Sequence, residues 1–179
     1  TDLGGTSGNL PLGSTAAPTV VTNGATLSHD TSASCTEPVI LYGFGVTNGG
    51  ALRGSSGSPR WYGGALCLTN TRINWEGGGQ WDWRGVSGTI NRVVATNGAN
   101  AYDVTIGGNG STIRFNIMYP WITCARIIKD GKCRLQTEQP AFCTGPVLFN
   151  GGEIYPRWPG GGLGSGTIYV TNAPYVAFV

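Results

Sequence analysis

The segment Ser58–Arg84 reads SPRWYGGALCLTNTRINWEGGGQWDWR and holds four of the six tryptophans of the chain. Within it, 65–68 and 71–75 are short runs of apolar, β-branched and aromatic residues, which favour strands. Glycines stand between these runs, and three of them follow one another at Gly77–Gly79. The segment therefore predicts short strands joined by tight turns, with the glycine triplet as a flexible hinge.

The rest of the chain continues this pattern of short strands and turns. The clearest alternation of large and polar residues lies in 102–106 and 112–119, on either side of a Gly107–Gly110 turn, and predicts an antiparallel hairpin. A second hairpin is predicted around Asp130–Gly131, because an Asp-Gly pair suits a tight hairpin turn. No stretch of ten or more residues has the apolar spacing of an amphipathic helix.

These elements predict the fold class. Short strands with turn signals about 8 to 12 residues apart are typical of β-sandwiches and barrels. At 179 residues the chain has the length of one domain. No internal repeat is evident, which argues against a propeller or a solenoid. We therefore predict a single all-β domain over 1–179, an immunoglobulin-like or jelly-roll-like β-sandwich with disulfides.

Composition and charge exclude some classes of function. Charged residues make up 11% of the chain, the net charge is +2, and no cluster of lysine and arginine forms a stripe. Nucleic acid is therefore not an expected partner. A hydrophobic content of 40% argues against disorder, in spite of the 31 glycines. No apolar run is long enough to cross a membrane, so membrane insertion is not expected.

The chain has five cysteines and a single histidine, and no two cysteines have Cys-x-x-Cys spacing. We therefore expect neither a metal site nor a cofactor. Disulfides are the better interpretation, and they place the protein in an oxidising compartment. Because the count is odd, at most two bridges form. We expect one bridge between Cys35 and Cys67, and one within the group Cys124, Cys133 and Cys143.

Aromatic and charged residues of the quoted segment predict a ligand site. Aromatic rings cover the apolar face of a sugar, while carboxylate and guanidinium groups bond its hydroxyls. We expect the tryptophans beside the glycine triplet to be exposed; core packing is the alternative for any one of them, because aromatic residues are frequent in strands. A Tyr-Pro-Arg-Trp-Pro run ending at Pro159 predicts a second wall of the site. The predicted ligand-binding residues are Arg60, Trp61, Glu76, Trp81, Asp82, Trp83, Arg84, Arg157 and Trp158.

Enzymatic chemistry has less support in the sequence, and we predict that the domain is not an enzyme. A serine hydrolase needs a base, but His29 lies in a polar turn and no Gly-x-Ser-x-Gly elbow accompanies it. A glycosidase needs two carboxylates across a cleft, and Glu76 and Asp82 are the one acidic pair near aromatic residues. A small secreted glycan hydrolase using these two acids therefore stays as an alternative.

The chain also resembles a known family. The processed start at Thr1, the short Gly/Asn/Thr-rich strands, the Thr123–Leu135 segment TCARIIKDGKCRL and the Ser165–Val170 strand are similar to the receptor-binding domains of bacterial chaperone–usher fimbrial tip adhesins. The resemblance is strongest over 120–179 and rests on no diagnostic motif. It implies a β-sandwich that binds glycan or protein through its loops. It also implies a pilin-type domain downstream of Val179.

The resemblance and the local chemistry together predict a fimbrial tip adhesin domain. Its expected partner is a host cell-surface glycan or glycoprotein, bound through the aromatic-rich loops. A fimbrial subunit and a periplasmic chaperone are expected to bind the downstream domain. The expected location is the cell surface, reached by export through the periplasm. A structural fimbrial or phage-surface subunit that binds only its neighbours is the alternative of a different class.

Overall fold

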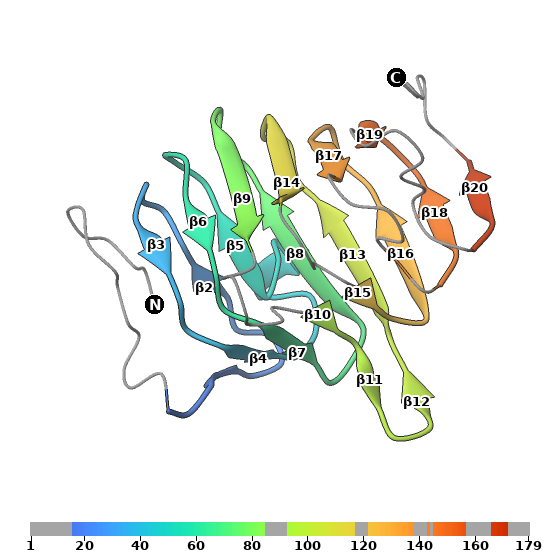
Figure 1. The fold of residues 1–179 in the computed structure, drawn as a ribbon, viewed down its shortest axis with the longest axis horizontal. Coiled ribbons are helices and arrows are strands. Elements are labelled where there is room, and N and C mark those ends of the chain that lie inside the picture. Colours follow the sequence, from blue (N-terminus) through green and yellow to red (C-terminus); the bar gives the residue numbers. More distant parts are fainter. Residues whose placement is uncertain are drawn as a thin grey trace.

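The computed structural model describes residues 16–84, 93–116, 122–137, 143, 145–156 and 166–171. Their strands wind into a parallel β-solenoid of about five turns (Figure 1). The all-β part of the prediction is confirmed, but the immunoglobulin-like or jelly-roll-like sandwich is wrong. The difference lies in strand pairing, because each strand pairs in parallel with strands of the neighbouring turns rather than with its neighbour in sequence.

Each of five successive turns, or coils, adds one strand to each of three parallel sheets, in the order B, A, C, and sheets A and C continue beyond the fifth coil. Sheet B contains β1 (Thr19–Val21), β4 (Val39–Leu41), β7 (Ala65–Cys67), β10 (Val93–Val94) and β15 (Ile122–Thr123). Sheet A contains β2 (Leu27–Ser28), β5 (Leu52–Gly54), β8 (Thr71–Trp75), β13 (Asp103–Gly107), β16 (Arg126–Lys129), β18 (Val147–Phe149) and β20 (Ile168–Val170). Sheet C contains β3 (Ser34–Cys35), β6 (Arg60–Trp61), β9 (Gln80–Arg84), β14 (Thr112–Asn116), β17 (Arg134–Thr137) and β19 (Glu153–Pro156).

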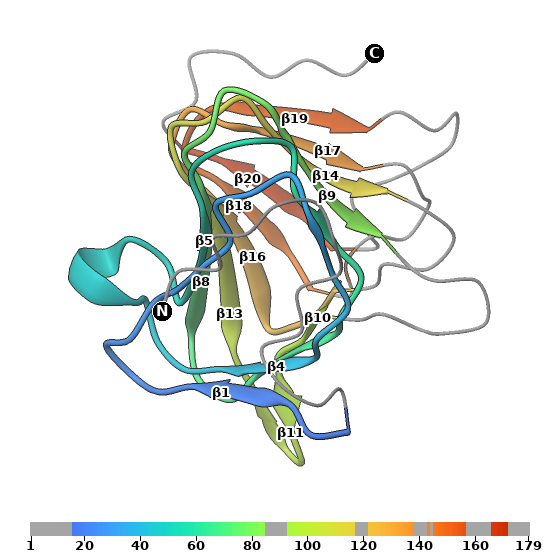
Figure 2. The same ribbon diagram turned by 90° about the vertical axis from the view of Figure 1, so that its left-hand side faces the viewer.

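Two short elements project from this frame, as the view along the coils shows (Figure 2). The 3-10 helix η1 (Val46–Asn48) lies in the connection between β4 and β5. The antiparallel hairpin of β11 (Thr96–Asn97) and β12 (Asn100–Ala101) lies between β10 and β13. Parallel strands need a long connection back to the same edge, and here the other two strands of the coil supply that connection.

Rows of side chains from successive coils fill the interior. In sheet B the row contains Val39, Ala65, Val93 and Ile122. In sheet C it contains Trp81, Ile113, Leu135 and Ile154. All of these side chains are buried. Burial of each large one stabilises the fold by about 1.5–3 kcal/mol, so the stacked rows form one continuous core.

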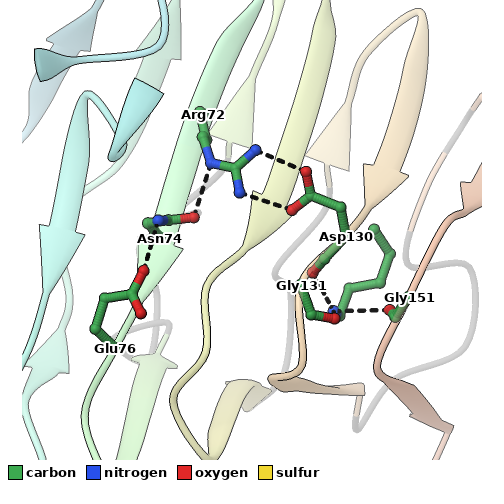
Figure 3. Close-up of polar contacts among 7 residues, drawn as sticks. Arg72, Asn74, Glu76, Asp130, Gly131 and Gly151 are labelled. Atoms are coloured by element: carbon green, nitrogen blue, oxygen red, sulfur yellow. Dashed lines mark hydrogen bonds and ion pairs between the residues drawn. The ribbon is translucent and has the colours of Figure 1, made fainter. Parts of the chain in front are cut away.

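Lys129 stands in an interior row of sheet A, between Ile106 and Phe149. Its side chain is fully buried, and burial lowers the pKa of the amine. Nζ donates hydrogen bonds to the main-chain oxygens of Asp130, at 2.6 Å, and Gly151, at 3.1 Å (Figure 3). These bonds satisfy a buried polar group and tie together the corners of two successive coils.

The solenoid repeat is hidden in the sequence because the coils differ in length. In one interior row, 33 residues separate Ile73 from Ile106, whereas 23 separate Ile106 from Lys129. The β11–β12 hairpin lies within the longer interval. The prediction that no repeat exists is therefore wrong, since the repeat is one of backbone register rather than of residue identity.

The two predicted hairpins are also wrong. β13 belongs to sheet A and β14 to sheet C, and the turn between them is a corner of the coil. The Asp130–Gly131 turn is likewise the corner between β16 and β17. Alternation identifies a half-buried strand but not its partner. The sequence therefore predicts where these strands lie but not with which strands they pair.

Gly77, the first glycine of the triplet, makes room for an indole together with Gly54 and Gly110. Trp75 points inward from the end of β8 and is fully buried. A Cβ on Gly54 would lie 2.7 Å from the ring, one on Gly110 would lie 2.6 Å from it, and one on Gly77 would overlap it. The prediction of a flexible hinge is therefore replaced by a steric requirement for glycine around Trp75.

All five cysteines are buried thiols. Cys35 lies in sheet C on the first coil, whereas Cys67 lies in sheet B on the third. Because these positions belong to different sheets of non-adjacent coils, the predicted Cys35–Cys67 bridge is wrong. Cys124 and Cys143 are the two cysteines in contact, with 3.5 Å between their sulfur atoms.

Candidate ligand-binding face

The three tryptophans predicted to stack on sugar rings lie inside the solenoid. Trp61 and Trp81 are fully buried and Trp83 is 4% exposed, so the expectation of exposed rings is wrong. The rings pack on one another, with centroids 6.0 Å apart for Trp61 and Trp83 and 5.9 Å apart for Trp81 and Trp83. His29 packs edge-on against Trp61, with ring centroids 5.5 Å apart.

Strand alternation explains this placement. In β9 the side chains of Trp81 and Trp83 point into the core, whereas Gln80, Asp82 and Arg84 occupy the outward positions. Successive side chains of a strand point to opposite faces of the sheet. The charged half of the predicted site therefore lies on the outer face of sheet C, separated from the aromatic half by the sheet itself.

Asp82 is the centre of this outer face. Arg114, the next residue in register on β14, donates from Nε to Oδ1 at 2.8 Å and from Nη2 to Oδ2 at 2.7 Å. Arg84 donates from Nη2 to Oδ2 at 2.7 Å, and Gln80 also donates to the carboxylate. One carboxylate thus holds two guanidinium groups in fixed positions.

The protonation state of Asp82 follows from these partners. Burial by itself would raise the pKa of the carboxyl group. The hydrogen bonds from Arg114 and Arg84 outweigh burial and lower that pKa below its ordinary value. Asp82 is therefore ionised at neutral pH, which makes it a structural anion and not a proton donor.

Further arginines extend the positive face along the solenoid. Arg60 is in register with Asp82 on the neighbouring strand β6, and its side chain is exposed. Arg134 on β17 pairs with Glu153, and its guanidinium carbon lies 5.5 Å from the centroid of the Tyr155 ring. We name the outward side chains of sheet C that carry this surface the arginine face: Arg60, Gln80, Asp82, Arg84, Arg114, Arg134, Glu153 and Tyr155.

Glu76 belongs to a different network, at the corner after β8. Its carboxylate accepts hydrogen bonds from Asn74 Nδ2, at 2.9 Å, and from the Asn109 amide, at 3.0 Å. Asn74 Oδ1 in turn accepts a bond from Arg72, which forms a bidentate pair with Asp130 (Figure 3). Glu76 and Asp82 share no hydrogen-bond partner in the described part of the chain.

Two predicted residues and five unforeseen ones complete the comparison with the sequence. Arg157 and Trp158 lie outside the described residues. The residues of the arginine face that the sequence did not predict are Gln80, Arg114, Arg134, Glu153 and Tyr155. The outward positions of alternating strands were the available signal, because Arg114 alternates with Ile113, which points into the core.

Comparison with known proteins adds no relative. No family model, no curated protein and no solved structure matches the chain. Within the described ranges, no group of three or more His, Cys, Asp or Glu side chains is placed to hold a metal ion. No helix among those same residues is long and apolar enough to cross a membrane.

Proposed function

We propose that the arginine face binds an extended acidic glycan and that the protein is an adhesive glycan-binding module. The observation that carries the proposal is the charge arrangement around Asp82. Among the described residues, the outward positions of sheet C hold four arginines and two carboxylates, Asp82 and Glu153, so this part of the face carries an excess of positive charge. Asp82 is already shared by two arginines, and Arg60 beside it forms no ion pair within the described chain.

Geometry supports an extended ligand. Strands of a sheet lie about 4.8 Å apart, and one register row along the solenoid axis contains Arg60, Asp82, Arg114, Gln136 and Tyr155. Guanidinium groups match the planar carboxylate and the sulfate in two-point hydrogen bonding. The hydrogen bonds that Arg84 and Arg114 donate to Asp82 hold these two groups in place before a ligand arrives, which reduces the entropy lost on binding.

Tyr155 supplies a partly exposed aromatic ring on which a sugar can stack, whereas the tryptophans are buried. It stands in register with Gln136 on the outer face of sheet C and is partly exposed. A tyrosine ring offers an apolar face to a sugar and a hydroxyl to its polar edge. The proposal therefore keeps glycan binding but moves it from loops to a sheet face, and it does not depend on the fimbrial resemblance, whose implied sandwich is wrong.

Binding to a panel of oligosaccharides tests the proposal. We expect binding to uronate- or sulfate-bearing oligosaccharides and not to neutral ones of the same length. Arg134→Ala should weaken binding about tenfold, which corresponds to one charge-assisted hydrogen bond. Arg126→Ala on sheet A is the matched control, because Arg126 and Arg134 are 45% and 44% exposed and each pairs with one carboxylate.

Two results would count against the proposal. Equal loss on replacing Arg126 and Arg134 would mean that the arginine face has no special part in binding. A folded protein that binds no acidic oligosaccharide on the panel would favour the structural-subunit alternative, for which self-association would then be measured.

A further inference from the structure

Two buried thiols face each other between successive coils near the C-terminal end of the described chain. Cys124 follows strand β15 on the fifth coil, and Cys143 begins the next coil, where it bridges to Ile122 of β15. Their sulfur atoms are 3.5 Å apart. Both residues are buried, at 6% and 2% exposure, and Cys143 Sγ also accepts a hydrogen bond from the Gly145 amide at 3.3 Å.

We propose that Cys124 and Cys143 form a disulfide that closes one complete coil of the solenoid into a covalent ring. The segment between them contains β16 of sheet A and β17 of sheet C, which is one full turn. The two sulfurs need to approach by about 1.5 Å to reach a bond length of about 2.05 Å. This proposal is independent of the arginine face.

The other three cysteines have no such partner. None of Cys35, Cys67 and Cys133 is in hydrogen-bonding contact with a second cysteine in the described chain. Cys35 lies on the first coil, and Cys67 occupies the sheet B row of Leu41. Cys133 lies at the corner beside Lys129. The structure therefore selects one of the three pairings that the sequence left open among Cys124, Cys133 and Cys143.

Formation of the disulfide needs an oxidant, and a small disulfide such as oxidised glutathione supplies it by thiol–disulfide exchange. The hydrogen bond from Cys124 lowers the pKa of Cys143, which makes Cys143 the better attacking thiolate. Attack on glutathione disulfide forms a mixed disulfide and releases one glutathione. Cys124, whose pKa the same contact and burial raise, then loses its proton and attacks the Cys143 sulfur, which releases the second glutathione. Two protein thiols are oxidised and one glutathione disulfide is reduced to two thiols.

The disulfide would make neighbouring coils of the solenoid harder to separate. A solenoid coil is held mainly by its neighbours, so an end coil separates more easily than a central one. A ring through Cys124 and Cys143 fastens the sixth coil, where Cys143 bridges to Ile122, onto β15. The oxidised protein should therefore resist separation of the fifth and sixth coils, as suits a domain working in an oxidising environment.

Thiol counting and peptide mapping test the bridge. After refolding the whole chain in a glutathione redox buffer, we expect three free thiols in denaturant instead of the five of the reduced chain. A non-reducing tryptic digest should contain one linked pair of peptides, holding Cys124 and Cys143. The oxidised form should melt about 5–10 °C above the reduced form.

Variants separate this pairing from any other. Cys143→Ala should retain four free thiols, whereas Cys35→Ala should retain two and still show the linked peptides. If a variant does not fold, the peptide map of the unmodified protein decides. Five free thiols in the folded protein after oxidation, or a linked peptide pair containing any other cysteine, would overturn the proposal.

Discussion

The outer faces of sheets A and C are built from the same residue types but distribute charge differently. On sheet A, Arg72 pairs with Asp130 and Arg126 with Asp103, so each of these two arginines has its own carboxylate, whereas Arg53 on β5 forms no ion pair within the described chain. On sheet C, Arg84 and Arg114 share Asp82. A one-to-one pair stabilises a surface and leaves little charge for a ligand, whereas the shared carboxylate orders two cations and leaves positive charge over.

Removal of the Asp82 carboxylate should have the largest effect on stability and should distinguish the outer face of sheet C from that of sheet A. Asp82→Ala leaves Arg84 and Arg114 without the anion that neutralises them, and we expect a loss of about 3 kcal/mol in the free energy of unfolding. Asp130→Ala on sheet A should cost about 1 kcal/mol, because its side chain is 29% exposed against 9% for Asp82. Urea unfolding of both variants measures the difference; equal losses would contradict it.

As the pH falls, protonation of His29 in the core should reduce the free energy of unfolding before protonation of Asp82 on the arginine face does. Burial lowers the pKa of His29 to about 4. The unfolded chain therefore binds the proton first, so the stability from neutral His29 is complete above about pH 6.5 and is lost as the pH falls towards 4. This loss should reach about 3 kcal/mol.

His29→Phe keeps an aromatic ring beside Trp61 and should abolish the loss in that window. Unfolding in urea between pH 7 and pH 4 measures it. The contribution of ionised Asp82, whose pKa is lowered, should be lost only at more acid pH, below the ordinary pKa range of a carboxyl group. Parallel pH curves for the unmodified protein and His29→Phe would contradict the assignment.

A methyl group added at Gly107 should disrupt the Arg72–Asp130 ion pair on sheet A. The Arg72–Asp130 pair passes over Gly107, where a Cβ would overlap Asp130 Oδ1 and lie 2.7 Å from Arg72 Nη2. We expect Gly107→Ala to cost about 1–2 kcal/mol of stability, measured by urea unfolding. Gly78→Ala is the matched control, since nothing lies within 4 Å of a Cβ at that position. A similar cost at both glycines would contradict the steric explanation.

Loss of one exposed cation should change binding more than stability. Arg60 forms no ion pair within the described chain, so Arg60→Ala should shift the free energy of unfolding by less than about 0.5 kcal/mol. Its affinity for an acidic oligosaccharide should fall about tenfold. Calorimetric titration and urea unfolding of the same preparation give both numbers. A large loss of stability would show that Arg60 has a structural role.

The sequence predicted strands better than sheets. The predicted strand at 71–75 matches β8, and the predicted strand at 102–106 overlaps β13. Their partners lie one coil away, and the coil length changes between Ile73, Ile106 and Lys129. Local patterns specify which residues are half-buried, but the register between coils depends on contacts distant in the sequence.

The candidate site shows the same limit. Alternation in β9 places Asp82 and Arg84 on the opposite side of the sheet from Trp81 and Trp83, which contradicts the prediction of exposed tryptophans in this segment. Arg114 could not be joined to Asp82 from the sequence, because that contact exists only once β9 and β14 lie side by side. Likewise the need for glycine at Gly107 comes from an ion pair between residues 58 positions apart.

Calorimetric titration of a linear oligogalacturonate into the unmodified protein, the Arg60→Ala/Arg134→Ala double variant and the Arg126→Ala control tests the central claim most directly. The methyl ester of the same oligosaccharide, which lacks the charges, completes the measurement. We predict binding that weakens with added salt, a loss of about 100-fold in the double variant, no change in the control, and no binding of the methyl ester. Equal binding of the acid and its methyl ester, or equal affinity of the double variant and the unmodified protein, would contradict the account.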